Sequence, residues 1–295
     1  MKPLVIIKTT WLIIAFSTLA ASCKKNSPET VVGPTSLTEQ TFTDVAYATT
    51  DGKQKMDVYL PANRSTATTY TLVMVHGGSW SGGDKTDFNT DIPNLKPLLG
   101  NYAIFNLNYR LTNGSSVLLA QQTADINTAF DFIISKAAEY NINTSKMAIM
   151  GASAGGHLAL LKAYKSNSDG RIKAMVDLFG PTDMAWMYNN LPFPTTSQPL
   201  IANVVGGTPT TNAAGYTNFS PINFVASTVP PTIIFHGTAD PIVPISESTR
   251  LQAKLQLASA THQYIIYTGE GHGWIGTNLT DTYNKATDFI KFWVK

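Results

Sequence analysis

The segment around residue 153 constrains the fold of this chain more than any other. The pentapeptide Gly-Ala-Ser-Ala-Gly at 151–155 follows the short apolar run 147–150 and precedes the run 157–164, whose composition fits a helix. A serine in a Gly-x-Ser-x-Gly turn between a strand and a helix is the arrangement called a nucleophile elbow. The turn is so tight that the residues beside the serine must lack bulk, and here they are all glycine or alanine. The pattern predicts a nucleophilic serine, Ser153, at the end of a strand.

Further along the chain, two residues fit the roles of the partners that such a serine needs. A serine hydroxyl attacks at neutral pH only with a base, an acid that orients the base, and donors for the oxyanion. Elbow-type enzymes carry the acid and then the histidine after the serine. Asp240 follows the apolar run 232–236, and His272 lies between two glycines after the run 264–267. Parallel sheets carry active sites where their strands end, so we expect Ser153, Asp240 and His272 to form a catalytic triad.

Other acidic residues leave alternatives for the acid. Asp177 lies within the apolar run 174–179, which does not favour an exposed carboxylate, and Asp183 follows Gly-Pro-Thr at a predicted strand end. An aspartate before a proline, as at position 240, is also an ordinary turn residue. Asp240 is preferred because one helix and one strand separate it from His272.

The remaining histidines are expected to have other roles. His157 lies one turn into the helix after the elbow and is expected to pack or cap there. His236 ends a strand and is expected to brace the acid loop, while His262 precedes a strand, where we expect it at the surface. No pair has a metal-ligand spacing such as His-x-x-x-His. We therefore expect no metal and no other cofactor.

The fifth histidine begins a motif that fits the oxyanion donors. His-Gly-Gly-Ser-Trp at 76–80 follows directly on the apolar run 72–75. Glycines allow the main chain to approach a reacting carbonyl with its N–H groups pointing inward. We expect the N–H groups of Gly78, Ser79 and Ala154 to form the oxyanion hole, the last at the positive end of a helix. A simple Gly-Gly turn is the alternative.

Together these motifs resemble the α/β-hydrolases of the esterase/lipase type. The His-Gly-Gly-x-Trp motif is similar to that of the feruloyl-esterase-like and hormone-sensitive-lipase-like carboxylesterases, a group that includes kynurenine formamidases. The matching stretches are 76–80, 108–111, 151–159, 180–183, 236–244 and 271–273. The resemblance implies that Ser153 is the nucleophile, Asp240 the acid and His272 the base. Lipases usually have a third glycine where this chain has Ser79. This difference leaves open which acyl group the substrate carries.

Alternation of apolar runs and helical patterns predicts the fold. Residues 42–60 suggest a hairpin that turns at Asp51-Gly52, with strands at 42–48 and 54–60. Further strands are expected at 71–75, 103–109, 147–150, 172–179, 232–236 and 264–267, and helices at 120–139, 154–165, 246–258 and 280–293. Such alternation implies an α/β-hydrolase fold, with a mostly parallel sheet covered by helices on both faces.

One segment interrupts this alternation before the acid loop. Residues 182–228 hold several large apolar side chains among proline, asparagine and threonine, namely Trp186, Met187, Tyr188, Phe193 and Phe219. We expect an insertion that could cap the site. Its aromatic side chains either contact substrate or pack the insertion itself.

The N-terminal residues resemble a bacterial lipoprotein signal. Lys2 and Lys8 precede the uncharged run 11–21, which is too short to span a bilayer, and the single cysteine, Cys23, follows Ala-Ala-Ser. We expect a signal peptide at 1–22, lipidation of Cys23, a flexible tether at 23–41 and an α/β domain at 42–295. Ordinary signal cleavage that leaves an unpaired cysteine is the alternative.

Composition narrows the partners. With 21 basic and 19 acidic residues the net charge is +2, so nothing favours nucleic acid. The prediction is a serine carboxylesterase in the periplasm or at the cell surface, bound to the membrane only by its lipid. It would act on small-molecule or polysaccharide-linked esters, with acetyl or feruloyl esters of carbohydrate as candidates. An amidase, peptidase or lipase with the same triad, and a non-catalytic surface-binding lipoprotein, are the alternatives.

Overall fold

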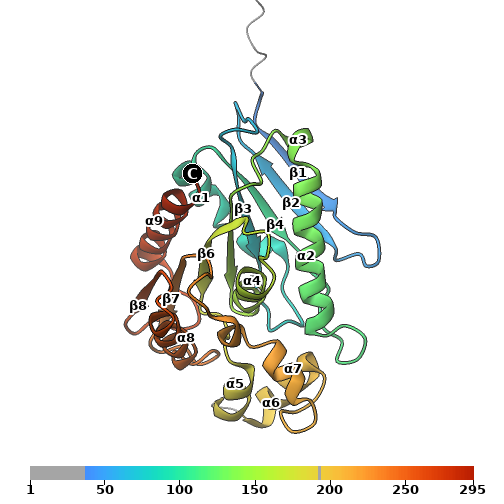
Figure 1. Ribbon diagram of the computed structural model, residues 1–295, viewed down its shortest axis with the longest axis vertical. Coiled ribbons are helices and arrows are strands. Elements are labelled where there is room, and N and C mark those ends of the chain that lie inside the picture. The colour runs from blue at the N-terminus through green and yellow to red at the C-terminus, as the bar shows by residue number, and fades with distance from the viewer. Residues whose placement is uncertain (1–36, 192–193) are drawn as a thin grey trace, which may run out of the picture. The chain divides into compact units, whose positions relative to one another are not determined.

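A single sheet forms the centre of the domain in the computed structural model, which describes residues 37–191 and 194–295. The expected signal peptide, Cys23 and the tether up to residue 36 lie outside the described residues. The strands are β1 (Gln40–Ala46), β2 (Lys55–Leu60), β3 (Tyr70–Val75), β4 (Tyr102–Leu107), β5 (Met147–Ala152), β6 (Ile172–Leu178), β7 (Thr232–Gly237) and β8 (His262–Tyr267). Within the described part of the chain their order in the sheet is β1-β2-β4-β3-β5-β6-β7-β8 (Figure 1).

The sheet is mostly parallel, as predicted. β1, β2 and β4 pair antiparallel, and the strands from β4 to β8 all run parallel. Every residue of β4 and of β7 is buried, which explains their continuous apolar runs, because a parallel sheet is covered on both faces.

Helices cover both faces of this sheet. The helices are α1 (Ile92–Leu99), α2 (Leu119–Ser135), α3 (Ala137–Tyr140), α4 (Ala154–Lys165), α5 (Met184–Asn190), α6 (Pro194–Val205), α7 (Ala213–Asn218), α8 (Ser246–Leu257) and α9 (Gly276–Trp293), with 3-10 turns η1 (Lys85–Phe88) and η2 (Pro221–Phe224). Along β3, Leu72 and Met74 pack toward α1 and α9, whereas Val73 and Val75 belong to the core with α2, α4 and α8 (Figure 1). The period of two along a strand produces these two cores.

Several predicted boundaries were wrong. The helix expected at 120–139 is divided at Lys136 into α2 and α3, and the strand expected to reach residue 109 ends at Leu107. Neither η1 nor α1 was predicted, because Pro93 and Pro97 interrupt the apolar spacing on which helix prediction depends. No helix in residues 37–191 and 194–295 is long and apolar enough to cross a membrane.

The domain also begins earlier than predicted. β1 starts at Gln40, inside the expected tether. The guanidinium of Arg64 donates to the carbonyl of Thr38 and to the side chain of Gln40, and the N–H of Asn63 donates to the carbonyl of Leu37. Residues 37–41 therefore belong to the folded domain.

Candidate active site

Ser153 occupies a strained turn between β5 and α4. Its φ and ψ are 53° and −124°, and a side chain at positive φ costs on the order of 1–3 kcal/mol. The N–H of Ser153 donates to the carbonyl of Leu178 at 2.8 Å, which fixes the turn against β6. The elbow expected from the pentapeptide is thus present in its geometry.

The three residues predicted as a triad lie in one hydrogen-bonded chain, which we call the candidate triad. His272 Nε2 lies 2.9 Å from Ser153 Oγ, and His272 Nδ1 lies 2.7 Å from Asp240 Oδ2. Because a carboxylate can only accept, the imidazole donates from Nδ1 and keeps its Nε2 lone pair for the serine hydroxyl. This is the tautomer that a general base for serine requires.

Asp240 is held as an ionised carboxylate. Its side chain is 0% exposed, and its Oδ1 accepts from the N–H groups of Ile242 at 2.8 Å and Val243 at 3.0 Å. Burial alone would raise the pKa of Asp240, but hydrogen bonds from His236 and His272 hold that pKa well below its ordinary value. The negative charge beside His272 persists far into the acid range.

His236 braces the acid loop. Its Nδ1 lies 2.7 Å from Ser248 Oγ, and its Nε2 lies 2.8 Å from the carbonyl of Val243 and 3.3 Å from Asp240 Oδ2. Because the Val243 carbonyl can only accept, Nε2 carries the hydrogen. The buried imidazole thus connects α8 to the loop that carries Asp240.

The two competing acids have other partners. Asp183 caps α5 through the N–H of Trp186 and forms an ion pair with Arg250 at 2.6 Å. Asp177 is buried within β6 and accepts from the N–H of Gly180. Burial raises the pKa of this carboxyl group well above its ordinary range. Within the described residues, the acid hydrogen-bonded to His272 is Asp240.

The loop at 76–80 lies directly beside Ser153. A Cβ atom on Gly77 would lie 3.0 Å from the carbonyl oxygen of Ala152 and 3.2 Å from Ser153 Cβ. Gly78, Ser79 and Trp80 have φ values of 110°, 51° and 61°, so the loop turns through consecutive left-handed conformations.

Two of the three predicted oxyanion donors share a cavity with the serine. Ser79 and Ala154 line the same cavity as Ser153, and Gly78 is exposed in the adjacent loop. Ala154 is the first residue of α4, and the first N–H groups of a helix have no intrahelical partner. The helix start also carries a partial positive charge that favours an anion there.

One histidine connects this loop to the insertion. Trp80 Nε1 donates to His157 Nδ1 at 3.1 Å, and His157 Nε2 lies 2.7 Å from the carbonyl of Phe219. His157 is buried on α4, and burial lowers its pKa to about 4, although the Phe219 carbonyl acts in the opposite direction. The imidazole is therefore neutral at pH 7, with its hydrogen on Nε2.

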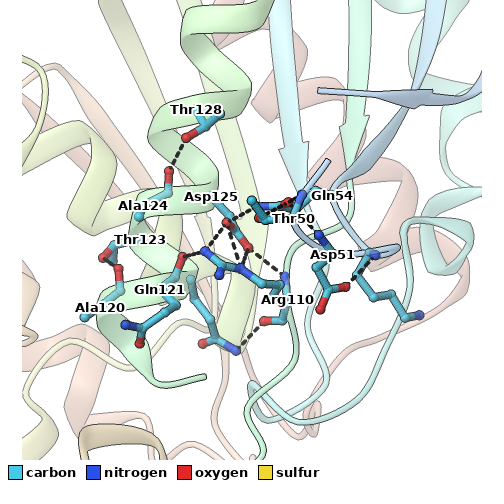
Figure 2. A network of polar contacts seen from close by, with 12 residues as sticks. Thr50, Asp51, Gln54, Arg110, Ala120, Gln121, Thr123, Ala124, Asp125 and Thr128 are labelled. Carbon is cyan, nitrogen blue, oxygen red and sulfur yellow. Dashed lines mark hydrogen bonds and ion pairs between the residues drawn. The ribbon is translucent and has the colours of Figure 1, made fainter. Parts of the chain in front are cut away.

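A buried polar network joins α2 to Arg110 and Gln54 (Figure 2), and a further residue of α2 extends it to the loop at 76–80. Asp125 on α2 accepts from Gln54 Nε2 at 2.7 Å, from the N–H of Arg110 at 2.9 Å and from Arg110 Nη2 at 2.6 Å. Gln122, one turn earlier, donates to the carbonyls of Trp80 at 2.7 Å and Arg110 at 2.9 Å. Sequence reasoning found neither role, because the partners of Asp125 and Gln122 come from distant segments of the chain.

The insertion forms one wall of a small cavity at Ser153, of about 60 Å³. Its lining is mainly aliphatic and includes Met187, Leu191, Leu200 and Ile201 from the insertion and Ile242 from the acid loop.

The large aromatic side chains pack the insertion rather than line this cavity. The Arg250 guanidinium lies 5.3 Å from the ring centre of Trp186, and Tyr188 meets Tyr216 edge-on at 5.8 Å. Phe219 lies under the ammonium group of Lys165. Phe193 lies outside the described residues. Among the described side chains, these aromatic rings thus have packing partners, which is one of the two alternatives that the sequence left open.

Comparison with protein families gives a match over most of the domain. Residues 56–255 match the family BD-FAE. The chain is 25% identical over 236 residues to the probable carboxylic ester hydrolase LipM of Mycobacterium tuberculosis, an alignment that covers 76% of this chain and 53% of that protein. The match thus spans about half the length of this curated relative.

Solved structures resemble the domain over a larger share. A truncated form of a carbohydrate esterase from gut microbiota superposes with a TM-score of 0.72 at 26% identity, covering 86% of this chain and 96% of the other. Esterase B of Lactobacillus rhamnosis, bound to an inhibitor, gives a TM-score of 0.74 at 19% identity, covering 86% and 87%. The second similarity concerns the fold alone.

Proposed function

This chain belongs to the BD-FAE family and has the α/β-hydrolase fold of esterases, and from that premise we propose that it is a serine carboxylesterase. The observation that carries the proposal is the hydrogen-bonded chain from Ser153 Oγ through His272 to Asp240. The curated relative that is a probable carboxylic ester hydrolase supports the same reaction.

The reaction follows from the positions of these groups. Ser153 Oγ bonds to the ester carbonyl carbon while His272 Nε2 takes the hydroxyl proton, and Asp240 stabilises the resulting imidazolium. The N–H groups of Gly78 and Ala154 hold the tetrahedral oxyanion, each contributing roughly 3 kcal/mol to transition-state stabilisation.

Release of the alcohol and hydrolysis of the acyl-enzyme complete the cycle. The bond from the carbonyl carbon to the alcohol oxygen breaks as His272 returns its proton to that oxygen, which leaves an acyl group on Ser153. A water molecule then attacks the acyl-enzyme with His272 as the base. The acid leaves and the serine hydroxyl is restored.

We propose a short acyl group and a carbohydrate-linked ester as the substrate. The cavity beside Ser153 is small, at about 60 Å³, and mainly aliphatic, which suits a short acyl group such as acetyl better than an aromatic acid such as ferulate. The similar structure of a carbohydrate esterase supports a carbohydrate ester. Acetyl esters are therefore favoured over the feruloyl esters that the sequence left open.

The test is hydrolysis of 4-nitrophenyl acetate, butyrate and octanoate and of methyl ferulate by the purified protein. Ser153→Ala should abolish turnover of every ester that the wild type hydrolyses, while Ser115→Ala, in an exposed loop, should not. Acetate should give the highest kcat/KM. Hydrolysis that survives in Ser153→Ala would remove the proposal, and activity on amides alone would replace it with an amidase.

We further propose that Cys23 is lipidated and that the domain acts outside the cytoplasm, tethered to a membrane. The support is the position of the single cysteine after an apolar segment that follows two lysines. Mass spectrometry of the mature protein from cells should find a diacylated N-terminal cysteine, absent in Cys23→Ala. A mature chain that begins elsewhere with an unmodified cysteine would contradict the proposal.

A further inference from the structure

A second cavity, larger than the one at Ser153, lies on the other face of the sheet at the same edge. We call it the α9 cavity; it has a volume of about 350 Å³. Its sheet residues, such as Met150 and Leu178, pack with α1 and α9, whereas Ala154 and Ile201 at the small cavity belong to the other core. The two cavities therefore flank the end of β5, where Ser153 lies.

The wall of the α9 cavity adjoins the candidate triad. Ala152 and Gly273, the chain neighbours of Ser153 and His272, both line it. Phe179 also lines it, and its ring centre lies 4.6 Å from that of His272. Phe179 has a φ of 46°, a conformation that a bulky residue adopts only when its surroundings enforce it.

The chemistry of this lining differs from that of the small cavity. The α9 cavity combines aromatic rings, including Phe179, Trp274 and Tyr283, with the half-buried carboxyl group of Asp91, which accepts from the Tyr283 hydroxyl at 2.5 Å. A carboxylate has acceptor capacity beyond one such bond. The residues that line the small cavity include none with a carboxylate or an ammonium group.

His76 adds a further acceptor to this lining. The residue is 1% exposed, and its Nδ1 donates to the carbonyl of Gly77 at 2.7 Å. Its Nε2 is then an acceptor, and it is buried with no hydrogen-bond partner among the described residues. Burial lowers the pKa of His76, so the ring is neutral at pH 7.

The positions of the leaving oxygen and of the oxyanion decide which cavity fits the acyl part of an ester and which fits the alcohol part. The leaving oxygen must come within hydrogen-bond reach of His272, whose ring contacts Phe179 in the wall of the α9 cavity. The proposed oxyanion donor Ala154 lines the small apolar cavity instead, together with Ser153 itself. The acyl chain therefore fits the small cavity and the alcohol the large one.

We propose that the α9 cavity binds the alcohol half of the ester and that this alcohol is a sugar ring. Aromatic faces pack against the C–H groups of such a ring, and its hydroxyls donate to carboxylates with the strength of charge-assisted bonds. The inference rests on the proposed esterase function and adds the subsite that selects the alcohol, with Asp91 as its main acceptor.

The experiment compares two acetate esters that differ only in the alcohol: a methyl xylopyranoside carrying one acetyl group, and ethyl acetate. Asp91→Asn retains an acceptor for Tyr283 but loses the charge, so kcat/KM for the sugar ester should fall about tenfold or more. For ethyl acetate it should stay within about twofold. The control is Asp288→Asn, the same change at an exposed side chain on α9, and it should alter neither value.

A second variant keeps the test decisive if Asp91→Asn folds poorly. Leu279→Trp, on the α9 wall, should fill the cavity and lower kcat/KM for the sugar ester selectively, while reaction with a serine-directed phosphonate shows that Ser153 is still active. Equal effects on both esters, or none, would overturn the subsite, as would a wild type that cleaves ethyl acetate but not the sugar ester. Hydrolysis retained in Ser153→Ala would instead overturn the proposed function.

Discussion

Gly155 lies directly against the carbonyl group of Val75. A Cβ atom on residue 155 would lie 2.1 Å from the Val75 oxygen and 2.3 Å from the His76 oxygen. The first turn of α4 thus meets the end of β3 with main chain against main chain. This contact sets the distance between Ser153 and the loop at 76–80.

Replacing this glycine should disrupt both stability and catalysis. Gly155→Ala must move α4 away from β3, at a cost of about 1–3 kcal/mol or more of unfolding free energy, and the same movement should lower kcat for 4-nitrophenyl acetate. Urea denaturation and steady-state kinetics measure the two effects. Gly52→Ala, where a Cβ would have no neighbour within 4 Å, is the matched control, and equal behaviour of the two variants would contradict the contact.

Exchanging single carboxyl groups separates the two candidate acids. Asp240→Asn should lower kcat by roughly 10³–10⁴-fold, because an amide favours the wrong imidazole tautomer and gives the imidazolium no charge partner. Asp183→Asn should keep kcat within about twofold, since that side chain caps α5 and pairs with Arg250. Turnover of 4-nitrophenyl acetate decides the assignment, and the reverse pattern would make Asp183 the acid.

Enlarging the small cavity should change the preferred acyl chain. Leu200 is half-buried in its lining, and Leu200→Ala makes room for further methylene groups, each worth about 0.8 kcal/mol when buried. The ratio of kcat/KM for butyrate to that for acetate should rise about 3- to 10-fold. The control is Leu257→Ala, because Leu257 is 84% exposed, and it should leave the ratio unchanged. An unchanged ratio in Leu200→Ala would place the acyl chain elsewhere.

Glu247 should make stability depend on pH near neutrality. Burial raises its pKa from 4.5 to about 7, although the carboxylate accepts from the N–H groups of Asp183 and Thr182. Between these two values the folded state holds a proton that the unfolded state has released, so stability falls as pH rises from 4.5 to about 7. The full shift corresponds to about 3 kcal/mol.

The neutral variant Glu247→Gln should lack this dependence. Its unfolding free energy relative to wild type should therefore increase between pH 5 and pH 8, with all other titrating groups common to both proteins. Urea denaturation at each pH gives the difference. A difference that stays constant with pH would show that Glu247 has the same pKa in the folded and unfolded states.

Local motifs with strict backbone requirements were the features that the sequence predicted well. The elbow at Ser153 and the loop at 76–80 need small residues at fixed spacing, and the order of parallel strands then brings Asp240 and His272 to the same sheet edge. The roles of these residues as catalytic groups remain predictions that the variants above test.

Features assembled from distant segments could not be predicted in this way. The α9 cavity joins residues near 76, 90, 150, 178 and 280, which have no common sequence pattern. α1 was missed because of its prolines, and the packing of Trp186 on Arg250 depends on how the insertion folds over α8. Composition revealed the aromatic side chains of the insertion but not the direction in which they point.

The single imidazole between Trp80 and Phe219 makes the connection between the loop at 76–80 and the insertion sensitive to acid. His157 accepts at Nδ1 and donates at Nε2 only while it is neutral. A second proton would turn Nδ1 into a donor that faces the donor of Trp80, so attraction would become repulsion at that end. The pKa of this ring is about 4. Below that pH the insertion and the loop at 76–80 lose the hydrogen-bonded connection through His157, while Asp240 still carries its charge.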